Sequence, residues 1–107
     1  MLKVVTITVL DLSNVLAGPF ACHQLAHLGA EVIKVEAPAG GDLARQLGGD
    51  PELIRKHMGV AFLAQNSGKR SITLNLKHAR GKEAFHKLVA TAGVLVENFR
   101  PGVMQRL

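Results

Sequence analysis

The chain alternates between two hydrophobic repeats, one typical of β-strands and the other typical of amphipathic helices. Residues 4–12 (VVTITVLDL) are almost continuously apolar and β-branched, which predicts a strand in the middle of a sheet. Residues 71–76 (SITLNL) alternate apolar with polar side chains, and the short apolar run 94–96 fits a strand buried on both faces. Together with residues 31–36 (EVIKVE), the pattern therefore predicts four strands.

A helix is predicted between the first two strands. Pro19 suits its first turn, where the missing N–H of proline costs no hydrogen bond. The helix is expected to run to about Leu28, to bury Phe20, Leu25 and Leu28, and to end at Gly29. The first third of the chain is therefore one strand–helix–strand unit.

A second such unit is predicted near the end of the chain. Its helix has one apolar stripe at helical spacing, formed by Ala84, Phe85, Leu88, Val89 and Ala92. Gly93 is expected to end this helix in a left-handed conformation.

The middle of the chain is less regular. Residues 37–49 are rich in Gly and Ala, which predicts a flexible surface loop. Asp50, followed by a proline, predicts the start of a short helix that runs to about Met58 and is closed by Gly59. Residues 61–66 fit either the end of a helix or an approach to the third strand.

This order of elements predicts an α/β fold, a Rossmann-like parallel sheet of about four strands with helices on both faces. The crossovers are expected to be right-handed. Ligands of such sheets bind just beyond the carboxyl ends of the strands. The residues that follow the last strand at this edge include Asn98, Phe99, Arg100 and Arg106.

The composition fits one domain, or part of one, in the cytoplasm. A length of 107 residues with 48% hydrophobic and 20% charged residues supports a single segment, 1–107, and argues against disorder. One cysteine excludes an internal disulfide framework and fits a reducing compartment. No apolar run is long enough to span a membrane, and residues 1–10 fit a buried strand better than a signal peptide.

Charge is distributed unevenly along the chain. Residues 1–66 have five lysines and arginines against six acidic residues (net −1), and residues 67–107 have eight against two (net +6). This difference predicts an anionic partner for the second half. Lys82 and Lys87 are expected instead on a solvated helix face, with Glu83 and Lys87 as an i,i+4 pair. Four Phe with no Trp and no Tyr disfavour a nucleic-acid partner.

The known nucleotide-binding motifs are incomplete. Gly68 and Lys69 resemble part of a Walker A loop, but Leu63 stands in place of its first glycine and Arg70 in place of Ser/Thr. No G-x-G-x-x-G follows the first strand. Gly18 would still let the backbone approach a ligand at the start of the following helix.

Two histidines and one cysteine in the first predicted helix are candidate ligands. His23 and His27 have the i,i+4 spacing of zinc helices, but the catalytic glutamate and a further ligand cluster are missing. They are expected to be surface or half-buried residues, and no metal is predicted. Cys22 is expected to be a packed small hydrophobe.

Three carboxylates, Asp11, Glu36 and Glu97, lie near strand ends. Each has the chemistry of a catalytic group, but capping or pairing with neighbours such as Arg70 or Lys34 is the commoner use. No serine elbow with triad partners is visible. No catalytic residue is therefore assigned.

Four segments carry a family resemblance: VLDLSNVLAGPFACHQLAHLGAEVIKVEAP, GGDLAR, NSGKRSITLNLKHARGKEAF and VLVENFRPGVMQRL. In this order and spacing they resemble the N-terminal part of the class III (family III) CoA-transferases. That family includes formyl-CoA transferase, carnitine CoA-transferase and the α-methylacyl-CoA racemases. The resemblance covers about residues 9–107, and the VENFRPGV form is closer to the transferase branch.

The resemblance implies that the chain is the CoA-binding N-terminal part of a larger CoA-transferase fold. Such enzymes form interlocked homodimers and move CoA between an acyl-CoA and a small carboxylic acid through a covalent aspartyl intermediate. That aspartate matches none of Asp11, Asp42 and Asp50, so the 107-residue chain alone is expected to be inactive. Its expected ligand is coenzyme A or acyl-CoA, with no metal, nucleic acid or membrane.

Carried over by position, the resemblance implicates nine residues in CoA binding: Leu16, Ala17, Leu74, Asn75, Leu76, Lys77, Asn98, Phe99 and Arg106. Lys77 and Arg106 would contact the phosphates, and Leu74 and Phe99 would cover the adenine or the pantetheine arm. Leu16 and Ala37 stand where the formyl-CoA branch has Gln and Arg. These departures disfavour formate or oxalate as the acyl group and remove one phosphate contact.

Two other functions stay open at this point: an α-methylacyl-CoA racemase-type relative and a non-catalytic CoA- or nucleotide-binding module. A short parallel sheet needs both faces covered. The segment by itself is therefore expected to expose apolar surface and to self-associate.

Overall fold

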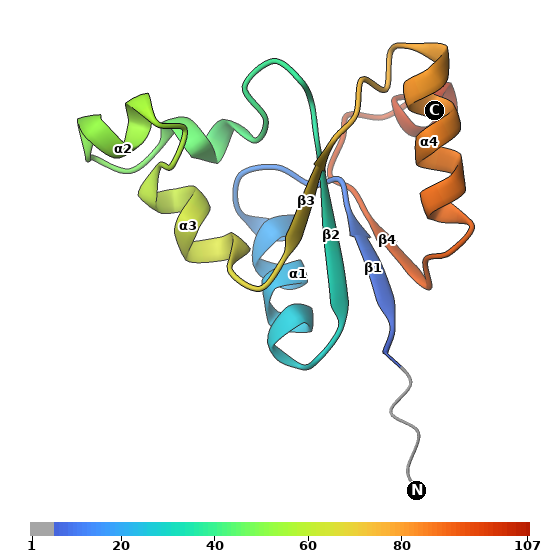
Figure 1. Cartoon of the computed structure of the whole chain (residues 1–107), viewed down its shortest axis with the longest axis horizontal. Helices are drawn as coiled ribbons and strands as arrows, with labels where there is room; N and C mark the ends of the chain where they lie inside the picture. The colour runs from blue at the N-terminus through green and yellow to red at the C-terminus, as the bar shows by residue number, and fades with distance from the viewer. Residues whose placement is uncertain (1–5) are drawn as a thin grey trace, which may run out of the picture.

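Four parallel strands form one sheet within residues 6–107, the part of the chain that the computed structural model describes. The strands are β1 (Thr8–Asp11), β2 (Glu31–Glu36), β3 (Arg70–Thr73) and β4 (Val94–Val96). They lie in the order β3–β2–β1–β4 (Figure 1). The predicted α/β class with a parallel sheet of four strands is confirmed.

β1 lies in the interior of the sheet, between β2 and β4. Val9 and Leu10 are completely buried there, as their continuous apolar run predicts. The strand is shorter than the predicted range 4–12, of which residues 4 and 5 lie outside the described part.

β3 also ends earlier than the predicted strand 71–76. Leu74 N still donates to the Glu36 carbonyl oxygen (3.0 Å), and the chain then turns at Asn75. Gly81 packs so closely on this turn that a Cβ atom there would overlap the Asn75 carbonyl oxygen. The turn leaves the residues that follow β3 at the carboxyl edge of the sheet.

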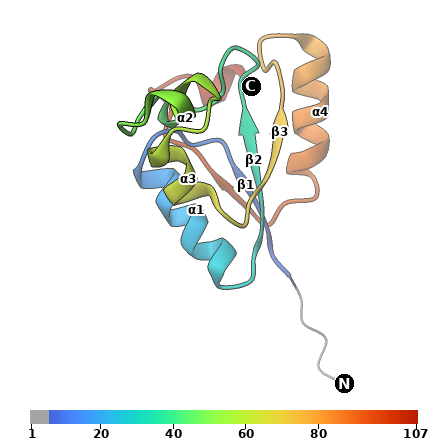
Figure 2. The same ribbon diagram turned by 60° about the vertical axis from the view of Figure 1, so that its left-hand side comes forward.

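Helices cover both faces of the sheet, as predicted. α1 (Ala17–His27) and α3 (Val60–Asn66) lie on one face, and α4 (Ala79–Val89) lies on the other (Figure 2). The α1 side has a core of Val9, Cys22 and Val32, and the α4 side has a core of Leu10, Leu12, Val35 and Phe85.

Of the three α1 side chains predicted to be buried, Leu25 packs against the core and the other two do not. Cys22 is completely buried, with Leu25 and Ala26 packed beside it, whereas Phe20 and Leu28 are 53% and 84% exposed. The buried positions are spaced i, i+3 and i+4, which is one narrow stripe of a helix. The prediction that Cys22 is a packed small hydrophobe is confirmed, and the predicted burial of Phe20 and Leu28 is wrong.

The two predicted glycine stops differ in outcome. Gly29 follows α1 with φ of 101°, so the left-handed conformation expected at a helix end is confirmed there. Gly93 does not have a positive φ, and α4 ends earlier, at Val89. Gly93 instead joins the sheet edge, because its N–H donates to the Thr8 carbonyl oxygen (2.9 Å).

The middle segment is more ordered than its composition suggests. It contains the 3-10 turn η1 (Leu43–Gln46) and the helix α2 (Pro51–Arg55), whose predicted N-cap is confirmed because the Asp50 side chain accepts the N–H of Glu52 and of Leu53. The ambiguous residues 61–66 belong to a helix, α3.

α2 ends at Arg55, earlier than the predicted Met58, so the prediction that Gly59 closes this helix is wrong. His57 has the positive φ at this place (56°), and Gly59 is the first residue before α3. A Cβ atom at Gly59 would overlap the Leu47 carbonyl oxygen, so the glycine is needed for close packing.

After β4, the last element is a short 3-10 turn, η2 (Met104–Arg106). In the described part, no helix has the length and apolar character needed to cross a membrane.

Candidate ligand-binding groove

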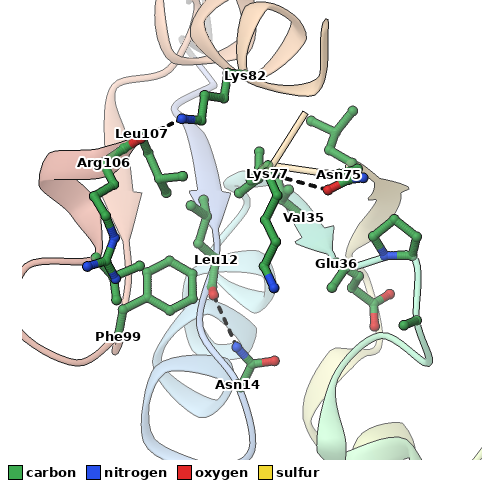
Figure 3. Close-up of a pocket in the computed structure, with 16 residues that line it drawn as sticks. Leu12, Asn14, Val35, Glu36, Asn75, Lys77, Lys82, Phe99, Arg106 and Leu107 are labelled. Carbon is green, nitrogen blue, oxygen red and sulfur yellow. Dashed lines mark hydrogen bonds between the residues drawn. The ribbon is translucent and has the colours of Figure 1, made fainter. Parts of the chain in front are cut away.

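A groove of about 670 Å³ opens at the carboxyl edge of the sheet, beside the first turn of α4 (Figure 3). Its apolar lining includes Leu12, Val35, Leu74, Leu76, Phe99 and Val103. Its polar and charged lining consists of Asn14, Glu36, Asn75, Lys77, Lys82 and Arg106. A pocket with an apolar floor and a few polar groups is the usual form of a small-molecule site.

Six of the nine residues predicted to bind a ligand line this groove: Leu74, Asn75, Leu76, Lys77, Phe99 and Arg106. Asn98 lies just outside, and its side-chain amide bonds both backbone groups of Asn14, accepting from the N–H (3.0 Å) and donating to the carbonyl (2.9 Å). Leu16 and Ala17 do not line the groove, and Leu16 is 60% exposed before α1. The predicted residues after β3 and β4 therefore come together in one groove, with Asn98 at its border. The predicted residues of the loop before α1 lie outside it.

Lys82 also lines the groove, which was not predicted. The prediction of a solvated helix face holds for Lys87, which pairs with Glu83 at 2.9 Å, but not for Lys82. Lys82 Nζ donates to the Arg106 carbonyl oxygen (2.8 Å). The signal was available, because Lys82 falls in the first turn of a helix that begins at the carboxyl edge of the sheet.

Three cationic side chains of the groove have no acidic partner. Among residues 6–107, none of Lys77, Lys82 and Arg106 forms an ion pair with a carboxylate. Figure 3 shows the Lys77 side chain extending across the groove toward Asn14, and Arg106 lying beside Phe99. Lys82 already donates to the Arg106 carbonyl oxygen. The groove therefore offers two further positive charges, those of Lys77 and Arg106, next to an apolar surface.

The acidic residue in the lining, Glu36, is fully occupied by donors from this chain. Its carboxylate accepts from Arg45 Nε (2.8 Å) and Nη2 (2.7 Å), from Asp42 N (3.0 Å) and from the Ser71 hydroxyl (2.7 Å). Burial alone would raise the pKa of Glu36, but these hydrogen bonds and the Arg45 charge lower it to about 2. Glu36 is therefore an ionised structural anchor, and a poor general base.

A network of buried charges lies under the loop that follows β1. Lys69 Nζ donates to Asp11 Oδ2 (2.7 Å), to Asn66 Oδ1 (2.8 Å) and to the Pro19 carbonyl (2.9 Å). Lys34 Nζ lies 3.9 Å from the same Asp11 oxygen. Burial would raise the pKa of Asp11, but its bonds to Lys69 and Ser13 and the charge of Lys34 lower it overall. Asp11 thus pairs with lysines, as expected for a carboxylate at a strand end.

Asp42 connects this network to the loop before α1. Its carboxylate lies 2.8 Å from Lys34 Nζ and accepts the N–H of Val15 (3.0 Å). Val15 has φ of 71°, a strained conformation for a β-branched residue, and the bond to Asp42 helps to hold it. Gly18, in the first turn of α1, packs against Ser13 without room for a Cβ atom, so the glycine is needed where the helix meets this loop.

The two histidines and the cysteine of α1 differ in burial. His23 is half-buried and His27 is exposed, and Cys22 is completely buried. Burial raises the pKa of the Cys22 thiol to about 11, so the thiol stays protonated at neutral pH. Over residues 6–107, no group of three or more His, Cys, Asp or Glu side chains is placed to hold a metal ion.

Comparison with known proteins places these residues in one family. A family model described as CoA-transferase family III matches residues 5–107. The chain is 42% identical over 99 residues to the succinyl-CoA–L-malate CoA-transferase alpha subunit of Chloroflexus aurantiacus, covering 92% of this chain and 23% of that protein. It is 46% identical over 101 residues to the formyl-CoA:oxalate CoA-transferase of Rhodopseudomonas palustris (strain TIE-1), covering 94% and 23%.

Solved structures agree with this placement. A variant of Rv3272 from Mycobacterium tuberculosis superimposes with a TM-score of 0.82 at 43% identity, over 94% of this chain and 26% of that one. A CAIB/BAIF family protein from Brucella suis gives a TM-score of 0.82 at 40% identity, again over 94% and 26%. The chain spans about a quarter of the length of these relatives.

Proposed function

The chain belongs to CoA-transferase family III, and we propose that its groove holds the coenzyme A part of an acyl-CoA substrate. The observation that carries the proposal is the pair of cations, Lys77 and Arg106, beside an apolar floor at the carboxyl edge of the sheet. Coenzyme A has the matching chemistry, because it joins an anionic pyrophosphate and 3′-phosphate to an apolar adenine and a flexible pantetheine arm. Ligands of open α/β sheets bind at this edge.

Each part of the groove has a role in this proposal. Lys77 and Arg106 donate charge-assisted hydrogen bonds to the phosphates, and Leu74 and Phe99 cover the adenine or the pantetheine arm. The bonds between Asn98 and Asn14 hold the neighbouring loops together, so Asn98 supports the groove from outside. Leu16 and Ala17 would meet the ligand only beyond the groove itself.

In the complete enzyme, we propose that CoA moves between an acyl-CoA and a small carboxylic acid through a covalent aspartyl intermediate. The names of the two transferases compared above each pair an acyl-CoA with a carboxylic acid. Asp11 and Asp42 are completely buried and paired with lysines, and Asp50 caps α2. None of the three is available as a nucleophile, so we assign that aspartate to a part of the enzyme outside these 107 residues. A homodimer is part of the same proposal.

Titration calorimetry with CoA tests the proposal. Lys77→Met and Arg106→Met remove one phosphate contact each, and Lys87→Met is the matched control, because Lys87 is exposed on α4 away from the groove. A hydrogen bond to a charged group contributes about 1.5–3 kcal/mol, so each groove variant is expected to weaken CoA binding roughly tenfold to a hundredfold. Dephospho-CoA lacks the 3′-phosphate and therefore identifies the cation that contacts this group. Substitution of that cation should make the affinities for CoA and dephospho-CoA equal.

Two results would reject the groove as the CoA site. One is equal CoA affinity in the wild-type protein and both groove variants. The other is a loss in Lys87→Met as large as in Lys77→Met, because that would indicate nonspecific attraction by net charge.

A further inference from the structure

The two histidines of α1 lie with their ring nitrogens in contact, on the face of the sheet opposite α4. His23 Nε2 and His27 Nε2 are 3.0 Å apart, and the two rings meet edge to face with centroids 4.3 Å apart. Neither residue lines the groove, and the proposed CoA function uses neither of them. The contact therefore calls for a separate explanation.

The surroundings of His23 determine which of its nitrogens carries a lone pair. His23 Nδ1 lies 3.1 Å from the Ser67 carbonyl oxygen, and a carbonyl oxygen only accepts, so Nδ1 carries the proton. Neutral His23 then presents an unprotonated Nε2 toward His27. This arrangement, with one ring nitrogen fixed by a backbone carbonyl and the other free, is the one that metal-binding histidines adopt.

His27 can present the same atom. Its ring is exposed, and its Nδ1 has no hydrogen-bond partner in residues 6–107. A shift of its proton from Nε2 to Nδ1 leaves the ring neutral and places a second lone pair beside the first, with no net release of a proton. A small rotation of this exposed ring then directs both lone pairs at one point.

The separation of the two nitrogens is short enough for one ion to bind both. Bonds of 2.0–2.1 Å from one ion to two nitrogens 3.0 Å apart enclose an angle of about 94°. This angle is close to the 90° of square-planar and octahedral coordination and below the tetrahedral angle of about 109° that Zn²⁺ prefers. Imidazole pairs at such an angle suit Cu²⁺ and Ni²⁺, which also bind nitrogen ligands most strongly among the divalent first-row ions.

We propose that His23 and His27 form a two-imidazole chelate for Cu²⁺ or Ni²⁺ on α1. The remaining coordination positions belong to water or to an outside ligand, because no group of three or more His, Cys, Asp or Glu side chains in the described residues is placed to hold a metal ion. The chelate spans one turn of α1 and keeps His23 on the Ser67 carbonyl, so metal binding also stabilises the packing of α1 against the segment before β3.

Calorimetric titration of the purified, untagged protein with NiCl₂ tests the proposal, with His23→Asn and His27→Asn as the site variants. The matched control is His86→Asn, an exposed histidine on α4. We expect one Ni²⁺ per chain in the wild type and in the control. Because two linked ligands bind far more tightly than one, each site variant is expected to lose roughly tenfold or more in Ni²⁺ affinity. MgCl₂, an ion that prefers oxygen ligands, should give no binding at this site.

A spectroscopic measurement keeps the test decisive if a site variant is less stable. Electron paramagnetic resonance of the Cu²⁺ complex should show two equatorial nitrogens in the wild type and one in His27→Asn, a change at an exposed ring. Equal Ni²⁺ affinity in wild type and His27→Asn, or the same Cu²⁺ spectrum in both, would overturn the proposal. Loss of CoA binding would not bear on it, because the groove shares neither histidine.

Discussion

Two lysine–carboxylate pairs of nearly equal length lie in opposite environments. Lys34 Nζ is 2.8 Å from Asp42 Oδ2, and the two side chains are 1% and 0% exposed. Lys87 Nζ is 2.9 Å from Glu83 Oε1, and those side chains are 76% and 65% exposed. From the distances alone, the two pairs would contribute equally to stability. Solvent screens the exposed pair, however, whereas a buried charge is costly without its partners. Burial therefore decides what each pair contributes.

The two environments also correspond to two uses of the same residue type. On the α1 side, Lys34 and Lys69 connect β1 and the loops at the carboxyl edge from inside, with every contact to oxygens of this chain. On the other side, Lys77 and Lys87 remain in solvent. A lysine buried with its partners fixes the shape of the loops, whereas an exposed lysine stays available to an anionic ligand.

The largest effect is expected from Asp11→Ala in the buried network. The substitution leaves Lys69 without its carboxylate partner and Lys34 with only Asp42. Breaking a buried pair on one side costs about 3–5 kcal/mol, which is a large share of the 5–15 kcal/mol of an ordinary domain. Urea denaturation followed by circular dichroism should show this loss in the free energy of unfolding.

A matched substitution makes this result interpretable. Glu83→Ala removes the carboxylate of the exposed pair and should leave the urea midpoint almost unchanged. A cost below about 1 kcal/mol for Asp11→Ala, similar to that of a surface substitution, would show that water reaches the network and that burial does not distinguish the two pairs.

The sequence predicted the frame of the fold but not this network. Hydrophobic periodicity was sufficient for the four strands, the helices on both faces and the groove at the carboxyl edge, because each depends on local spacing and on general rules of parallel sheets. The contact between Lys69 and Asp11 joins residues 58 positions apart. Lys34 alternates with apolar residues along β2 and is buried only because two distant loops close over it.

The errors have the same origin. Phe20 and Leu28 are as apolar as Leu25, and only the position of the sheet decides which side of α1 is covered. Leu16 and Ala17 do not line the groove, so their predicted contact with the ligand stays a prediction. Lys82 was predicted on a solvated helix face, whereas the start of α4 places it beside Arg106.

The second effect is a loss of stability in acid, for which Glu36 is the best probe. Its pKa falls from 4.5 to about 2 on folding, so the folded state favours the ionised carboxylate. This stabilisation is fully present above about pH 4.5 and is lost as the pH falls toward 2, and it amounts to at most about 3 kcal/mol. Asp11, whose pKa is also lowered, changes stability in the same direction.

Urea midpoints at pH 7, 4 and 3 measure this dependence in the wild type and in Glu36→Gln. The glutamine variant is less stable at pH 7, because it loses the charge opposite Arg45, and its midpoint should fall less on acidification. If the variant and the wild type lose equal stability between pH 7 and pH 3, then Glu36 is not the group that titrates.

The smallest effect is expected from the exposed pair on α4, and it tests the comparison from the other side. Lys87→Met removes the ammonium group 2.9 Å from Glu83, and an exposed i,i+4 pair contributes only about 0.3–0.5 kcal/mol. The urea midpoint should therefore shift slightly at low salt, and the shift should disappear at 1 M NaCl, where the screening length is about 3 Å. The loss from Asp11→Ala should persist at 1 M NaCl, because ions do not reach buried charges. The contradicting result is a loss of more than about 1 kcal/mol in the free energy of unfolding of Lys87→Met that does not depend on salt. Glu83 and Lys87 would then be held as rigidly as the interior pairs, and solvent exposure would not explain the difference between the two regions.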